Sequence, residues 1–110
     1  MNVKVKVDAG VCGFRTSIRA SSEDSQNVAF EIASGCEKIR GFADALKANG
    51  AVDAYQEIST EAQSVVMAVA QRSLKGCCAG CAVPVGIFKA MQVAAGLALP
   101  KDISIEIACE

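Results

Sequence analysis

Residues 2–34 read NVKVKVDAGVCGFRTSIRASSEDSQNVAFEIAS, and three segments within them alternate apolar with polar side chains. The alternation covers residues 3–7, 14–20 and 28–32, and it returns near the end of the chain at residues 103–107. A period of two residues predicts a strand with one apolar and one polar face. Such strands favour an antiparallel or mixed sheet over a parallel sheet that is buried on both faces. We therefore expect a four-stranded sheet with one side open to solvent.

Between the third and fourth alternating segments, the apolar period lengthens to that of an amphipathic helix. It predicts helices at about residues 36–48, 61–72 and 84–95. Asn49-Gly50 is suited to end the first helix, and Thr60-Glu61-Ala62-Gln63 has the form of a capping box for the second. The element order β-β-β-α-α-α-β then predicts an α+β fold with the three helices on one face of the sheet.

Length and charge limit the classes of function. A chain of 110 residues is expected to form one domain, residues 1–110. Its 11 basic and 12 acidic residues give a net charge of -1, which does not favour binding to nucleic acid or to a membrane surface. The N-terminus alternates charge with valine, and no apolar run suggests a signal peptide or a membrane span. These features predict a cytoplasmic protein.

Six cysteines and no histidine are the strongest chemical signal in the chain. In a reducing compartment such thiols are expected to bind metal, to act in redox chemistry or to be buried, instead of forming structural disulfides. Without imidazole, a soft-metal site must be built from thiolates, and Ser-His and Cys-His catalytic pairs are excluded. A free cysteine also packs as a small hydrophobe, which is the role expected for Cys109. The other five are Cys12, Cys36, Cys77, Cys78 and Cys81.

Three of these cysteines fall at predicted strand ends or helix starts, namely Cys12, Cys36 and Cys81. Unpaired amides and the helix dipole at a helix N-terminus stabilise negative charge, so a thiolate is expected at Cys36 and at Cys81. Flanking glycines allow the backbone to approach a metal centre closely. Cys77 and Cys78 are adjacent and point in different directions, so at most one of them is expected to join a common site.

The order Cys12-Gly13 before a strand pair, Gly35-Cys36 at a strand-to-helix junction and Cys81 before a late helix resembles a known pattern. It is similar to the three-cysteine arrangement of the U-type iron–sulfur scaffold proteins, the IscU and NifU N-terminal family. This resemblance implies a sheet packed by helices, and a site that holds an iron–sulfur cluster or zinc. It also implies that the partner is a protein that donates the cluster or accepts it.

The chain departs from that pattern at two positions. Phe14 and Gly80 stand where the scaffold family has Asp and His, residues associated with cluster lability and transfer. Without these two residues, the site is expected to bind the metal or cluster stably instead of delivering it to another protein. Residues 8–14 and 95–102 also look like segments of a family of short, uncharacterised prokaryotic proteins, for which no activity follows.

The leading hypothesis is an IscU-like metal-binding protein. Its ligands would be Cys12, Cys36 and Cys81, with Cys77 or Cys78 as the fourth. Four thiolates suit a tetrahedral zinc ion and a cubane iron–sulfur cluster equally well, so both cofactors stay open.

Two alternatives belong to other classes of function. Cys78-Ala79-Gly80-Cys81 is a C-x-x-C motif, which in a thiol redox protein forms a reversible disulfide. The third hypothesis is an interaction domain with buried thiols and no chemistry. For that domain, small residues of the last helix would allow close packing within the fold or against a second copy in a homodimer; they are Ala90, Ala94, Ala95 and Gly96.

An ordinary enzyme is not favoured. Glu23, Asp24, Glu57 and Glu61 lie in or beside polar segments, where a solvated carboxylate is the expected state and not a paired acid and base. Residues 8–13 contain two glycines but lack the Lys-Ser/Thr and the following helix of a phosphate loop.

Overall fold

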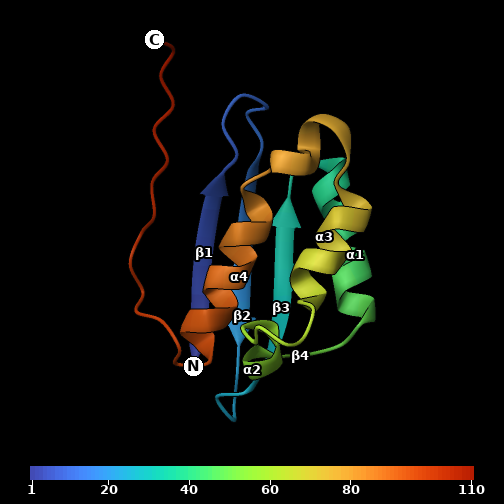
Figure 1. Cartoon of the computed structure of the whole chain (residues 1–110), viewed down its shortest axis with the longest axis vertical. Helices are drawn as coiled ribbons and strands as arrows, with labels where there is room; N and C mark the ends of the chain where they lie inside the picture. Colours follow the sequence, from blue (N-terminus) through green and yellow to red (C-terminus); the bar gives the residue numbers. More distant parts are fainter.

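In the computed structural model, which describes residues 1–110, three of the predicted strands form the main part of one sheet. They are β1 (Asn2–Asp8), β2 (Arg15–Ser21) and β3 (Asn27–Ser34), each antiparallel to its neighbour. Ile18 of β2 is fully buried and lies opposite Val5 and Ile32, as the alternation predicts. The α+β class and the four-stranded antiparallel sheet are confirmed (Figure 1).

The fourth strand is not the one that the alternation predicts. It is β4 (Val52–Asp53), which pairs with Asn27 and Val28 of β3 and gives the sheet order β1-β2-β3-β4. Residues 103–107 form no strand, and every residue from 101 to 110, here named the tail, is exposed. A strand forms only where a neighbouring edge supplies hydrogen bonds and apolar cover, and the tail has neither within its own chain. The predicted final strand is therefore wrong for the isolated chain.

The helices lie on one face of this sheet (Figure 1), as predicted. The longer ones are α1 (Glu37–Ala48), α3 (Val65–Ser73) and α4 (Val83–Ala94), and the order also includes a short α2 (Ala54–Glu57) and a 3₁₀ helix, η1 (Gly76–Gly80). Helix α4 packs on β1 and β2, whereas α1 packs on β3 and on α3. The largest fully buried core side chains come from these elements: Phe42, Ile18, Leu46, Ile87, Met91, Val28, Val66, Val69 and Val83.

Helix α3 begins later than the capping box predicts. Its N-cap is Ser64, whose Oγ accepts a hydrogen bond from the Met67 N–H at 3.0 Å. The Glu57 carboxylate accepts two more, from the N–H groups of Val65 (2.6 Å) and Val66 (2.8 Å). Glu57 is only 5% exposed, so the expectation of a solvated carboxylate at this position is wrong. A carboxylate eight residues away in sequence replaces the local capping box and fixes the start of α3.

Three of the four small residues predicted to allow close packing of the last helix lie in the core, and Gly96 is exposed. Ala90, Ala94 and Ala95 are almost fully buried. At Gly86, an added Cβ would lie 2.5 Å from Val7 Cγ2, so the absence of a side chain lets α4 approach β1 closely. Of the two packing roles expected for these small residues, the structure shows the one within the fold, against the sheet.

One segment is long and apolar enough to cross a membrane, contrary to the sequence expectation. It covers Gly76–Ala94, 19 residues with a mean hydropathy of 1.5. In the fold this segment comprises η1 and α4, interrupted at Cys81, and 44% of its most apolar window is buried inside the protein. A core helix meets the same criteria of length and composition, so the segment is weak evidence for a membrane span.

Candidate functional site

Five of the six cysteines lie in segments that are found at one end of the molecule. The β1–β2 loop, the start of α1, η1 and the start of α4 are all found at this end (Figure 1). We call it the cysteine end. Its residues are Cys12 in the loop, Cys36 before α1, Cys77 and Cys78 in η1, and Cys81 between η1 and α4.

Burial divides these five cysteines into two groups. Cys36, Cys78 and Cys81 are half-buried and pack against the hydrophobic core, whereas Cys12 and Cys77 are exposed. The structure thus separates the adjacent pair, with Cys78 on the core side and Cys77 on the solvent side. Cys109 lies on the exposed tail, so the expectation that it packs in the core is wrong.

Cys36 is the N-cap residue of α1, as the sequence predicts. Its backbone is extended (φ -88°, ψ 124°), and no side-chain hydrogen bond caps the helix. The Cys36 N–H donates to Ser34 Oγ at 3.1 Å, and Ser34 Oγ lies 2.8 Å from the hydroxyl of buried Thr16. The Cys36 carbonyl accepts the first helical hydrogen bond, from the Arg40 N–H at 3.0 Å. Cys36 therefore stands at a helix N-terminus, where the first amides have no partner within the helix.

Cys78 and Cys81 share one 3₁₀ turn. The Cys78 N–H donates to the Lys75 carbonyl at 3.4 Å, and the Cys81 N–H donates to the Cys78 carbonyl at 3.1 Å. Side chains three residues apart eclipse in a 3₁₀ helix, which agrees with both sulfurs packing toward the core. The N-cap of α4 is Ala82, so Cys81 lies one residue before the N-cap and is not itself part of the helix start. Cys36 is thus at the N-cap of its helix, whereas Cys81 is not.

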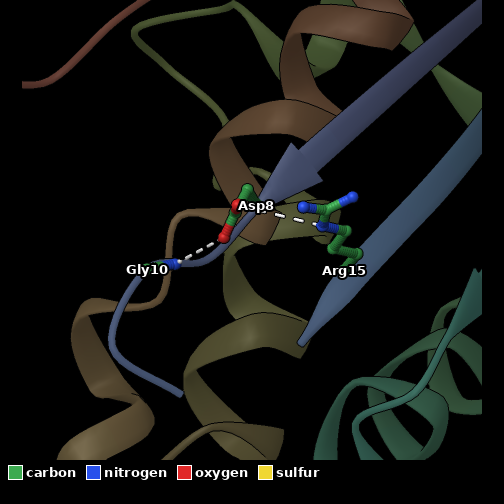
Figure 2. Close-up of polar contacts among 3 residues, drawn as sticks. All are labelled: Asp8, Gly10 and Arg15. Atoms are coloured by element: carbon green, nitrogen blue, oxygen red, sulfur yellow. Dashed lines mark hydrogen bonds and ion pairs between the residues drawn. The ribbon is translucent and has the colours of Figure 1, made fainter. Parts of the chain in front are cut away.

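Asp8 organises the loop that carries Cys12 (Figure 2). Its Oδ1 accepts a hydrogen bond from the Gly10 N–H at 3.1 Å, and its Oδ2 lies 3.9 Å from Nε of Arg15, the cross-strand partner. Gly10 and Gly13 both have positive φ, and the Gly13 N–H donates to the Gly10 carbonyl at 2.9 Å. Local polar contacts thus shape this exposed loop, and few buried apolar contacts restrain it.

Phe14 connects this loop to the start of α1. A Cβ added at Gly35 would lie 3.3 Å from Phe14 Cδ1, so the ring covers Gly35, directly before Cys36. The sequence pattern assigned Phe14 to a strand and indicated no role for it in the site. Gly35 has no side chain, so the ring can approach its backbone closely. An aromatic residue together with such a glycine is the sequence feature that could have indicated this contact.

A shallow basic depression on the open face of the sheet adjoins the cysteine end. Its volume is about 680 Å³, and small residues such as Ser17 and Ala33 line it beside Lys4, Lys6 and Arg15. These side chains point away from the helices because alternate residues of a strand face opposite sides. The depression extends to Gly35, the residue before Cys36.

Two carboxyl groups have displaced pKa values, and both are remote in sequence from the cysteines. Hydrogen bonds from the Asn27 side chain, and then from the Asn27 and Gln26 amides, hold the pKa of Asp24 far below its usual value. A hydrogen bond from the Gln26 side chain is the largest cause that lowers the pKa of Asp53, the N-cap of α2. These carboxylates stabilise turns, which accounts for their charge without a catalytic role.

The structure brings the cysteines to one end but not into a formed coordination shell. No three side chains of Cys, His, Asp or Glu lie close enough together to hold a metal ion. The thiols are free, and none is joined in a disulfide. The molecule is thus an α+β protein with a cysteine-rich end, where three of the cysteines pack against the core.

The sequence of this α+β protein matches the model of a recognised family. The sequence model of a family of unknown function, DUF6951, matches residues 3–107, and the chain belongs to that family. No curated protein and no solved structure matches the chain. The resemblance to an uncharacterised family is thereby supported, whereas the comparisons give no support to a relationship with the U-type scaffold proteins.

Proposed function

We propose that this protein binds a thiophilic metal, as zinc or as an iron–sulfur cluster, through Cys36, Cys78, Cys81 and Cys12. The observation that carries the proposal is the shared position of three half-buried thiols at one end of the fold. The protein has no histidine, so thiolates are the soft ligands that it offers.

The ligand positions suggest how the site assembles. Cys36, Cys78 and Cys81 are attached to α1, η1 and the entry to α4, all packed on one core. Cys12 lies on an exposed loop that is held mainly by local hydrogen bonds. Closure of this loop would cost little packing energy and would bring the fourth thiolate to the other three. Metal binding and local folding are coupled, so the metal would complete the site as the loop closes.

Cys77 is the natural control for this assignment. It is adjacent to Cys78 in sequence, carries the same thiol and is exposed. In an anaerobic titration with Co²⁺, we expect the unaltered protein to develop thiolate-to-metal charge-transfer absorption at one ion per chain. Cys78→Ser should weaken Co²⁺ binding by at least about 10–100-fold, the loss that outer-shell changes alone can produce, whereas Cys77→Ser should leave it unchanged. Equal titrations for Cys77→Ser and Cys78→Ser would refute the ligand assignment.

A donor or acceptor protein is the partner that fits an iron–sulfur function. It would approach the cysteine end, where Lys4 and Lys6 of the adjoining depression favour an acidic contact surface, whereas Arg15 is paired with Asp8. Such binding should weaken as salt is added, because it would depend on exposed charges.

The second candidate function is reversible dithiol chemistry at Cys78 and Cys81. The specific observation is that one 3₁₀ turn carries both half-buried sulfurs. Oxidation would form one S–S bond and transfer two electrons and two protons to an oxidised thiol partner such as glutathione disulfide. Titration in glutathione buffers, followed by the mass of the alkylated protein, tests this function. A disulfide that forms reversibly between these two residues supports it, and persistence of both thiols in oxidised buffer refutes it.

A further inference from the structure

The outer edge of β1 has no partner in the chain. Because the sheet order is β1-β2-β3-β4, the backbone groups on one side of β1 are left unpaired. Its inward side chains Val3, Val5 and Val7 pack against the core but are only half-buried. An exposed edge of this kind pairs readily with another strand.

The tail has the pattern of a strand and lacks a partner as well. Ile103, Ile105 and Ile107 alternate with polar residues and are 56%, 72% and 93% exposed. The tail extends away from the end of α4 and stands apart from the rest of the protein (Figure 1). Its one backbone hydrogen bond is local, from the Lys101 N–H to the Leu99 carbonyl at 2.9 Å. The family match extends to residue 107, so the alternating segment is part of the family's shared sequence.

The tail and β1 are complementary in length, polarity and charge. β1 has seven residues, and the alternating segment is about as long. When the three isoleucines are aligned with the three valines, the isoleucines extend the apolar face of the sheet. In either strand direction this register places Glu106 beside a lysine of β1, Lys6 if parallel and Lys4 if antiparallel. Opposite charges on neighbouring strands favour such pairing.

We propose that residues 101–107 of one chain pair with the edge of β1 in a second copy, and that the exchange is reciprocal. Within one chain the tail leaves the body after Pro100 and makes no hydrogen bond to β1. The outer edge of β1 is therefore open to the tail of a second copy. Reciprocal exchange gives a closed two-fold dimer and satisfies both unpaired edges at once. It also covers apolar side chains that the single chain leaves in water.

The first test is the mass of the full chain in solution, measured by sedimentation velocity with a reductant present so that Cys109 cannot form crosslinks. We expect twice the 11.4 kDa chain mass. Ile105→Lys should raise the dimer dissociation constant at least about tenfold, since burial of one isoleucine contributes more than that factor. Val11→Lys is the matched control, because Val11 is fully exposed on the β1–β2 loop, and it should leave the dissociation constant unchanged.

The second test identifies which chain supplies the strand. Labelled and unlabelled chains are mixed in equal amounts, and isotope-filtered NMR should detect contacts between Ile105 of one chain and Val5 of the other. A monomer would overturn the proposal, whether its tail is free or paired with its own β1. A dimer without these contacts would also overturn it. Neither test depends on metal, so their outcome is separate from that of the metal-binding proposal.

Discussion

Replacement of Gly86 by alanine tests the close contact between α4 and the sheet. The added methyl group would lie 2.5 Å from Val7 Cγ2, 3.5 Å from Ile18 Cδ1 and 3.7 Å from Val5 Cγ1. The first distance is far below a van der Waals contact, so α4 or Val7 must move. Gly41, in the exposed interior of α1, is the matched control because an added Cβ there meets no atom within 4 Å.

The two substitutions share one favourable effect and differ in one unfavourable effect. Alanine stabilises a helix interior by about 1 kcal/mol relative to glycine, so Gly41→Ala should raise the free energy of unfolding by about that amount. At Gly86 the same gain is opposed by overpacking, which costs about 1–3 kcal/mol. We therefore expect Gly86→Ala to be about 1–3 kcal/mol less stable than Gly41→Ala. Urea unfolding followed by far-UV circular dichroism measures both values, and equal stabilisation by the two variants would refute the packing argument.

Two further predictions concern carboxylates that stabilise local structure. Glu57→Ala removes the acceptor for the amides of Val65 and Val66, so urea unfolding should show that the free energy of unfolding falls by about 2–4 kcal/mol. Glu57→Gln should lower it less, and an unchanged value for Glu57→Ala would show that Ser64 alone caps α3. Because hydrogen bonds from Asn27 lower the pKa of folded Asp24 below its usual 3.8, its contribution to stability is complete above that pH and is lost as the pH falls toward the folded-state pKa. Asp24→Ala should therefore flatten the fall in the urea midpoint below about pH 4, and an unchanged acid slope would contradict this assignment.

Much of the fold follows from local sequence patterns. The three alternating segments at the N-terminus identify β1, β2 and β3, because one face of each packs on the core. Asn49-Gly50 correctly marks the end of α1, where Gly50 has a φ of 76°. These features are determined by residues that are close in sequence, so the sequence pattern alone is enough to predict them.

The errors arise where distant residues decide the structure. β4 has only two residues and exists because β3 offers an edge, so it has no periodicity of its own. The start of α3 depends on Glu57, which reaches its amides from outside the helix. The alternation at residues 103–107 indicates a strand, but alternation does not say which edge the strand joins. The tail is the place where sequence pattern and single-chain structure differ most.

In the candidate site too, the sequence predicts what local residues determine and misses what packing determines. The sequence places Cys12 in a loop and Cys36 at a helix start, and the structure has both there. The sequence could not choose between Cys77 and Cys78, because that choice depends on which side of η1 faces the core. It also placed Cys81 at the start of the third helix, whereas Cys81 is the C-cap of η1 and Ala82 stands between it and α4 as the N-cap.

Metal and sulfide analysis of protein purified without air, combined with its visible spectrum, tests the central proposal most directly. Stoichiometric metal that is lost in a Cys36→Ser/Cys78→Ser/Cys81→Ser variant would agree with it. Visible colour with acid-labile sulfide would indicate an iron–sulfur cluster, and a colourless protein with bound zinc would indicate a zinc site. A metal-free, fully folded protein whose stability does not change with added Zn²⁺ or with a chelator would contradict the proposal.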